Sequence, residues 1–337
     1  MIIVMRSGAT DADIKRVVEV IEENGYESYL DKGVERSIIG IRTGRHDLTP
    51  ENFRMLPNVE DVVRILKPYK LASREFHPTD TVFEVKGATF GGSDITLMAG
   101  PCSIESEEQI FSTARAVKAA GAKVLRGGAF KPRSSPYAFQ GMGEEGLKLM
   151  ADAGRELDMP ICTEVMHPRN LDLVAAYSDI LQIGARNMQN YDLLKEVAMV
   201  HKPVFLKRGM AATVEDLLMS AEYLLDGGCE NVILCERGIR TFETATRNTL
   251  DISAVPVLKK LSHLPVVIDP SHASGHVEYV KSLSLCAIAA GADGLMVEVH
   301  PCPGKALSDG PQSLTFEMFA DLVAACRRVA EAVGRTL

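Results

Sequence analysis

The stretch PVVIDPSHASGHVEYVKSLSLCAIAAGADGLMVE, residues 265–298, decides the fold class of this chain. It contains a short apolar strand at Val266–Ile268, a helix at Val277–Ala290 and a second apolar strand at Gly294–Val297. Short apolar strands that alternate with amphipathic helices are typical of a parallel sheet covered by helices. From about residue 95 onward the pattern occurs eight times, which predicts an α/β fold closed into a (β/α)8 TIM barrel.

The rest of this region follows the same alternation. The other strands are predicted at Ile95–Ala99, Lys123–Arg126, Pro160–Thr163, Ile180–Ile183, Val204–Lys207 and Val232–Leu234. Further helices are predicted at Glu107–Ala120, Glu144–Leu157, Val214–Leu225 and Phe316–Val333. An open doubly wound sheet is the alternative, but no GxGxxG sequence follows the first strand.

Residues 1–67 predict a separate N-terminal domain. A strand at Ile2–Met5 precedes a helix that Thr10 and Asp13 cap, and Gly25 ends that helix. Two strands (Glu27–Leu30, Ser37–Ile41), a short helix led by Pro50 and a strand at Val59–Leu66 follow. This βαββαβ order is that of a ferredoxin-like α+β domain. We interpret residues 68–80 as a linker and 81–337 as the barrel with a hairpin before it (Val82–Val85, Ala88–Phe90).

Composition excludes several classes of protein. The 337 residues suit one barrel of about 250 residues plus a smaller domain. The formal net charge of −8 argues against nucleic acid as a partner. No apolar run reaches the roughly 18 residues of a membrane helix, so we expect no membrane association. Seven scattered cysteines without a CxxC pair fit a reducing, cytoplasmic location.

The carboxyl ends of the predicted strands carry a possible set of metal ligands. Active sites of TIM barrels lie at this end of the barrel. Cys102, His272, Glu298 and Asp309 follow strands 1, 7 and 8, which adjoin one another in a closed barrel. One thiolate, one imidazole and two carboxylates suit a divalent ion such as Mn²⁺, Fe²⁺, Zn²⁺ or Co²⁺. Taken singly, each residue is more often core filler, a helix cap or a loop contact.

Long cationic side chains form a second group at the same strand ends. In a protein that is acidic overall, such a group suggests a site for anionic substrates. Ordinary ion pairs with neighbouring carboxylates are the other interpretation, and a lysine here can also form a Schiff base with a carbonyl substrate. The cations are Arg126, Lys131, Arg133, Arg186, Lys207 and Arg237.

At these strand ends the sequence resembles the 3-deoxy-D-arabino-heptulosonate 7-phosphate (DAHP) synthases, in the type I beta branch that carries an N-terminal ferredoxin-like domain. The resemblance covers essentially the whole chain. Its motifs are AGPCS (99–103), LRGGAFKPRSSPYAFQG (125–141), QIGARN (182–187), LKRG (206–209), CERGIRTFETATRNTLD (235–251), DPSHASG (269–275) and VEVHPCPGKALSDG (297–310).

The resemblance implies an aldol-type transferase that condenses phosphoenolpyruvate with erythrose 4-phosphate, the first step of the shikimate pathway. Cys102, His272, Glu298 and Asp309 match the ligands of one divalent metal ion. The catalytic residues expected are Lys131, Cys102, His272 and Glu164, with Lys131 as the general acid and Glu164 positioning water. The substrate-binding residues implied are Arg126 and Lys131 for the carboxylate, Ala185, Arg186, Lys207 and Arg237 for the phosphate of phosphoenolpyruvate, and Arg133 and Ser134 for the aldose phosphate.

The resemblance also implies a homotetramer whose N-terminal domain binds an aromatic amino acid effector. Tyr29 and Asp31 stand where tyrosine-sensitive members carry a histidine and a serine, so the identity of the effector stays open.

Three other functions are weighed against this one. The 3-deoxy-D-manno-octulosonate 8-phosphate (KDO8P) synthases share the barrel but use arabinose 5-phosphate and carry an asparagine where this chain has Pro132-Arg133. A Schiff-base aldolase would be trapped by borohydride and unaffected by chelators. A catalytically idle amino-acid sensor would bind its effector without turnover.

Overall fold

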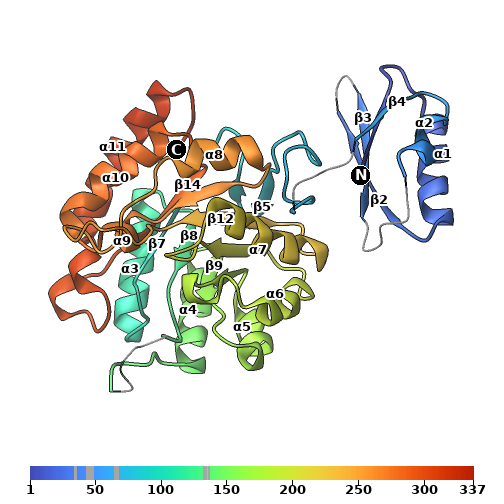
Figure 1. Ribbon diagram of the computed structural model, residues 1–337. Helices are drawn as coiled ribbons and strands as arrows, with labels where there is room; N and C mark the ends of the chain where they lie inside the picture. Colours follow the sequence, from blue (N-terminus) through green and yellow to red (C-terminus); the bar gives the residue numbers. More distant parts are fainter. Residues whose placement is uncertain (34–35, 43–48, 64–67, 132–134, 136) are drawn as a thin grey trace. The chain divides into compact units, whose positions relative to one another are not determined.

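The computed structural model describes residues 1–33, 36–42, 49–63, 68–131, 135 and 137–337. These residues form two compact units, Met1–Thr79 and Asp80–Leu337, each described by itself (Figure 1). No helix among the described residues is long and apolar enough to cross a membrane.

The N-terminal unit is ferredoxin-like, which confirms the prediction. Its strands form one antiparallel sheet in the order β2-β3-β1-β4, with two helices packed against it. The elements are β1 (Ile2–Met5), α1 (Asp11–Glu23), β2 (Glu27–Lys32), β3 (Ser37–Arg42), α2 (Glu51–Arg54) and β4 (Val59–Val63). The sequence predicted the last strand to reach Leu66, and residues 64–66 lie outside the described residues.

Helix α1 shows why this unit folds as predicted. The Thr10 hydroxyl accepts a hydrogen bond from the Asp13 amide, and the Asp13 carboxylate accepts one from the Thr10 amide, which completes a capping box. Ile14, Val17 and Ile21 then lie on one face at helical spacing and are buried in the core of the unit. Burial of this stripe holds the helix on the sheet.

Residues 68–79, part of the predicted linker, cluster with the N-terminal unit. The ring of Phe76 stacks on that of Tyr29 with centroids 5.6 Å apart. A Cβ atom added to Gly40 would lie 2.1 Å from the Phe76 ring, so the glycine leaves the space that this aromatic ring occupies. The segment is therefore anchored to the sheet by Phe76.

The second unit is a closed parallel barrel of eight strands with helices between them, which confirms the predicted fold class. Its strands are β7 (Thr96–Gly100), β8 (Val124–Arg126), β9 (Ile161–Glu164), β10 (Ile180–Ile183), β11 (Val204–Lys207), β12 (Val232–Glu236), β13 (Val266–Ile268) and β14 (Gly294–Glu298). The helices are α3 (Glu107–Ala120), α4 (Glu144–Glu156), α5 (Leu171–Tyr177), α6 (Tyr191–Ala198), α7 (Val214–Asp226), α8 (Ala254–Leu261), α9 (Pro270–Ser274), α10 (Val277–Ala289) and α11 (Phe316–Ala332).

The barrel closes through the last and first strands. Strand β14 pairs with β7 over five positions, from Gly294 opposite Thr96 to Glu298 opposite Gly100. The pairing places the loops that follow these two strands side by side. Residues almost two hundred positions apart in the sequence therefore meet at the carboxyl end of the barrel.

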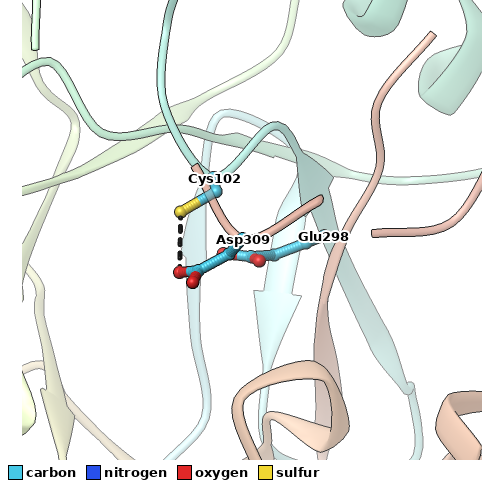
Figure 2. Close-up of side chains that lie close together, drawn as sticks. All are labelled: Cys102, Glu298 and Asp309. Atoms are coloured by element: carbon cyan, nitrogen blue, oxygen red, sulfur yellow. Dashed lines mark hydrogen bonds between the residues drawn. The ribbon is translucent and has the colours of Figure 1, made fainter. Parts of the chain in front are cut away.

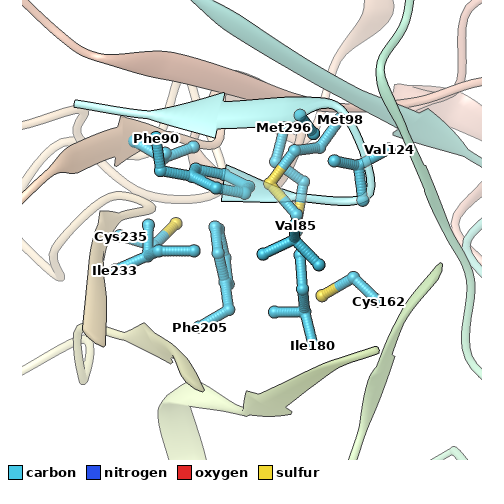
Figure 3. Close-up of a cluster of buried hydrophobic side chains, with 12 residues drawn as sticks. Val85, Phe90, Met98, Val124, Cys162, Ile180, Phe205, Ile233, Cys235 and Met296 are labelled. Carbon is cyan, nitrogen blue, oxygen red and sulfur yellow. The ribbon is translucent and has the colours of Figure 1, made fainter. Parts of the chain in front are cut away.

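The hairpin of β5 (Phe83–Val85) and β6 (Ala88–Phe90) packs against the barrel interior (Figure 3). Its Phe90 lies in one cluster with Val124 and Ile180, the first residues of their strands. The hairpin therefore covers the amino ends of the strands and leaves the carboxyl ends for function. The whole cluster consists of Val85, Ala88, Phe90, Met98, Val124, Cys162, Ile180, Phe205, Ile233, Cys235, Val267 and Met296.

We predict that Phe90→Ala lowers the free energy of unfolding by about 3–5 kcal/mol, because it removes a fully buried ring from this cluster. Phe242→Ala is the matched control, since that ring is 97 % exposed and its loss should change stability by about 0.5 kcal/mol or less. Urea unfolding followed by circular dichroism measures both. Equal stability of the two variants would contradict the assigned role of the hairpin.

Candidate active site

A pocket opens at the carboxyl ends of the barrel strands. Among the described residues, its lining contains six cationic side chains and two carboxylates, Glu164 and Asp309. An excess of positive charge in a protein of net charge −8 indicates a site for anionic small molecules. The described residues that line it are Arg126, Gly127, Gly128, Lys131, Glu164, Gln182, Gly184, Ala185, Arg186, Lys207, Met210, Arg237, Arg247, His272 and Asp309.

Three of the four predicted metal ligands lie close together, and one of them, Asp309, also lines this pocket (Figure 2). One ligand atom from each of Cys102, Glu298 and Asp309 lies within 4.8 Å of the other two. Glu298 ends β14 and pairs with Gly100, two residues before Cys102, so barrel closure brings the first two together. The loop after β14 returns Asp309, whose Oδ2 lies 3.2 Å from the Cys102 sulfur.

The fourth predicted ligand, His272, lies next to this cluster. Its Nε2 is 3.4 Å from Oε1 of Glu298. Its Nδ1 is 2.7 Å from Oδ2 of Asp269, the residue that caps α9 and accepts a hydrogen bond from the His272 amide. The Asp269 carboxylate lies beside Nδ1 and Nε2 faces the cluster, as is usual for metal-binding histidines, although Nδ1 has no partner in hydrogen-bond geometry among the described residues. The donors therefore fit a borderline divalent ion.

Burial and neighbouring charges set the protonation states of these groups. Burial, reinforced by the negative charge of Glu298, raises the pKa of the Cys102 thiol to about 12. Burial also lowers the pKa of His272, which favours the neutral ring that binds metals. Burial would raise the pKa of Glu298, but His272 and Arg126 hold it below its usual value. A cation at this position would favour the thiolate of Cys102.

Two of the predicted cations lie beside the cluster. Arg126 ends β8 and is buried, and it donates to the Pro101 carbonyl at 2.7 Å and to Glu298 at 3.1 Å. Its Nε is buried and has no hydrogen-bond partner among the described residues. Lys131 donates to the Cys102 carbonyl at 2.8 Å. A buried Nε without a partner indicates that Arg126 is positioned for a further acceptor.

The other predicted residues that the structure describes line the same pocket. Lys207 ends β11 and forms a short ion pair with Asp269, while Ala185, Arg186 and Arg237 follow β10 and β12. Arg133 and Ser134, predicted for the aldose phosphate, lie outside the described residues. The structure therefore brings together every predicted site residue that it describes.

Glu164 lies at the end of β9, where its Oε2 accepts a hydrogen bond from Gln182 at 3.2 Å. A Cβ atom on Gly184 would lie 2.1 Å from its Oε1. The glycine of the QIGARN motif thus makes room for this carboxylate in the pocket.

Three residues of the site were not predicted from the sequence. Asp269 holds both His272 and Lys207, Arg247 lines the pocket, and Gln312 donates to Glu298 at 2.8 Å. Asp269 directly follows β13, so its position at a strand end was a usable signal. Arg247 and Gln312 lie well within long loops, where position in the sequence indicates little about direction.

The fold and the pocket define a (β/α)8-barrel protein with a cation-rich site, suited to small anionic molecules, at the carboxyl ends of its strands. A family model described as "DAHP synthetase I family" matches residues 80–333, and one described as "DAHP synthase ferredoxin-like domain" matches residues 1–67. The chain belongs to the DAHP synthetase I family.

Similar proteins agree with this assignment. The chain is 51 % identical over 334 residues to a phospho-2-dehydro-3-deoxyheptonate aldolase of Thermotoga maritima, covering 99 % of both chains. A crystal structure of this Thermotoga maritima aldolase (DAHP synthase) matches with a TM-score of 0.80, covering 99 % of this chain and 98 % of that one. A 2-dehydro-3-deoxyphosphooctonate aldolase of Azoarcus sp. is 32 % identical over 261 residues, 71 % of this chain and 92 % of that one.

We predict that Asp269→Asn lowers the free energy of unfolding of the metal-free protein at pH 7 by about 3–5 kcal/mol, because it leaves Lys207 buried without its carboxylate. Burial would raise the pKa of Asp269, but His272 and Lys207 hold it well below its usual range. Its stabilising effect is therefore present above the unfolded-state pKa of about 4 and is lost as the pH falls through the folded-state value.

Urea unfolding at several pH values measures this effect. The difference between wild type and Asp269→Asn should stay constant from pH 6 to 8 and shrink only below about pH 4. Asp226→Asn, at an exposed position, is the control and should change stability by about 0.5 kcal/mol or less. An Asp269→Asn protein as stable as wild type would contradict the assignment.

Proposed function

We propose that this chain condenses phosphoenolpyruvate with D-erythrose 4-phosphate and water to DAHP and phosphate, the entry reaction of the shikimate pathway. The observation that carries the proposal is the likeness to the Thermotoga maritima aldolase over both units of the chain. The cation-rich pocket supports it, because both substrates are phosphorylated. The octulosonate aldolases, by contrast, match only part of the chain at about a third identity.

Phosphoenolpyruvate is assigned to the cationic part of the pocket. Arg186, Lys207 and Arg237, together with Ala185, would hold its phosphate, and Arg126 and Lys131 its carboxylate. Support comes from their common placement around one pocket and from the buried Nε of Arg126, which has no partner among the described residues. Planar guanidinium groups bind phosphate and carboxylate with two hydrogen bonds each. Arg133 and Ser134 are assigned to the phosphate of the aldose.

Cys102, His272, Glu298 and Asp309 would hold one divalent ion, Mn²⁺, Fe²⁺, Zn²⁺ or Co²⁺. The grouping of their donor atoms supports this assignment. When bound there, such an ion supplies a Lewis acid for the aldehyde oxygen of the aldose. Asp269 orients His272, and Gln312 orients Glu298, so the donors are preorganised.

In the proposed reaction C3 of phosphoenolpyruvate attacks the aldehyde carbon, and the aldehyde oxygen becomes a hydroxyl by accepting a proton. Lys131 is assigned as the general acid that gives this proton, since its ammonium group lies beside the cluster at the Cys102 carbonyl. Water adds at C2, positioned by Glu164, and the resulting hemiketal phosphate releases phosphate by cleavage of its C–O bond. The cations of the pocket stabilise the negative charge throughout.

We further propose that the chain assembles into a homotetramer and that its N-terminal unit binds an aromatic amino acid that inhibits the reaction. The match of residues 1–67 to the ferredoxin-like domain of DAHP synthases supports a regulatory role for this unit.

Phosphate release from phosphoenolpyruvate tests the function directly. We expect turnover with erythrose 4-phosphate, loss of turnover after EDTA and recovery with added Mn²⁺. Added tyrosine or phenylalanine in the same assay tests inhibition, and light scattering tests the tetramer. Activity with arabinose 5-phosphate alone would instead establish a KDO8P synthase, and effector binding without turnover an idle sensor.

We predict that Lys131→Met lowers kcat by about 10²–10⁴-fold, the usual contribution of a general acid. Lys86→Met is the control, because Lys86 lies in the β5–β6 turn at the other end of the barrel and pairs with Asp179. Near-normal turnover of the Lys131→Met protein would exclude the assigned role.

A further inference from the structure

Arg247 has no role in the proposed reaction, yet it lines the same pocket as Arg237. It belongs to the loop that follows β12, and its side chain reaches the loop that follows β14. A long cationic side chain in a pocket adds to the positive field that attracts anionic ligands.

The backbone around Arg247 is fixed. Its amide donates to the Ser274 carbonyl at 2.8 Å, and the next amide, of Asn248, donates to Ala273 at 2.9 Å. Gly275 has a φ of +72°, and a Cβ atom there would lie 2.6 Å from the Cβ of Arg247. The Arg247 stem thus lies against a glycine backbone, which sets its direction into the pocket.

The guanidinium group of Arg247 is weakly paired. Its side chain is 42 % exposed, and it donates to Gln312 at 3.1 Å and to Asp309 at 3.4 Å. Arg208, nearby in the fold, shows the contrasting case, because it is buried between carboxylates of Glu236 and Asp251 at 2.9 and 2.8 Å. Arg208 is therefore neutralised by the protein, whereas only Nη1 of Arg247 donates to a described residue, and its other donors remain for a ligand in the pocket that it lines.

Arg237 is also only weakly paired. Its contacts among the described residues are with the carbonyls of Gly238 and His272, both at 3.4 Å, and not with a carboxylate. Burial lowers the pKa of Arg237, and the charge of Arg247 lowers it further, against the opposing effect of Asp269. Two arginines that repel each other in one pocket are stabilised by an anion bound between them.

We infer that Arg247 is a third arginine of the phosphate subsite and binds the phosphate of phosphoenolpyruvate together with Arg186 and Arg237. The inference rests on the proposed function for the identity of the ligand. Before the ligand binds, contacts with Gln312 and Asp309 hold the Arg247 side chain in place. The bound phosphate then replaces the longer of these two contacts, the one with Asp309. Loss of one bidentate, charge-assisted contact weakens binding roughly tenfold or more.

Calorimetric titration of phosphoenolpyruvate into the full-length protein tests the inference. We expect Arg247→Gln to raise Kd at least tenfold and Arg247→Lys to give an intermediate value, because lysine keeps the charge but loses the planar fork. Arg240→Gln is the matched control. This substitution removes the same charge from the same loop, but Arg240 is exposed and is not among the residues that line the pocket. The Kd of the Arg240→Gln variant for phosphoenolpyruvate should therefore stay within twofold of wild type.

A second titration, with Mn²⁺ alone, separates substrate binding from a purely structural role. Removing a cation beside Asp309 should leave the Mn²⁺ affinity equal or higher on electrostatic grounds. If Arg247 serves only to hold Asp309, Arg247→Gln will weaken Mn²⁺ binding and leave the Kd of phosphoenolpyruvate unchanged, which overturns the inference. Equal Kd values for Arg247→Gln and Arg240→Gln overturn it as well.

Failure of the proposed function is a different result. A wild-type protein that neither binds phosphoenolpyruvate nor turns it over would refute the function itself. A wild-type protein that does both, with an unaffected Arg247→Gln variant, would refute only the role of this arginine. Circular dichroism of each variant confirms that the chain has folded.

Discussion

The pairing of β14 with β7 is the constraint on which the site depends. Glu298 ends one strand, Cys102 follows the other, and only closure of the barrel places their side chains within reach. Because the strands are parallel, all their carboxyl ends lie on one side of the barrel, and charged side chains from distant parts of the sequence gather there. The hairpin with Phe90 covers the opposite end and confines access to the carboxyl side.

Accumulated charge is costly unless it is balanced, and buried carboxylates provide the balance. Asp269 is the clearest case, because one side chain contacts both Lys207 and His272 and caps the helix that carries the histidine. Glu298 likewise contacts two of these groups, Arg126 and His272. Each carboxylate connects the cationic part of the pocket with the metal-type cluster. Substitution of either would therefore disturb both functions together, and effects of such substitutions will not be additive.

The sequence predicted the framework well because its signals are local. Helix α3 was predicted with the same bounds, since Ser106 caps it and Gly121 ends it. The predicted ligand set was accessible from the sequence because Cys102, His272 and Glu298 lie at a strand end or within four residues of one. The role of Arg247 was not predictable. The direction of its side chain depends on contact between its aliphatic stem and Gly275, which lies twenty-eight residues further along the sequence. Such contacts between two loops follow from tertiary packing, which neither periodicity nor composition encodes.

The distribution of charge also explains how an acidic protein can bind anionic substrates. Surface carboxylates give the chain its net charge of −8, but they lie in water, where their field is screened within about 8 Å at physiological ionic strength. The pocket cations lie in or beside the low-dielectric interior, where the field is screened less. Arg208, although buried nearby, is neutralised by Glu236 and Asp251 and contributes little to that field. The strength of the anion site therefore depends on the arginines that have no carboxylate closer than 3.4 Å among the described residues. In the pocket these are Arg186, Arg237 and Arg247.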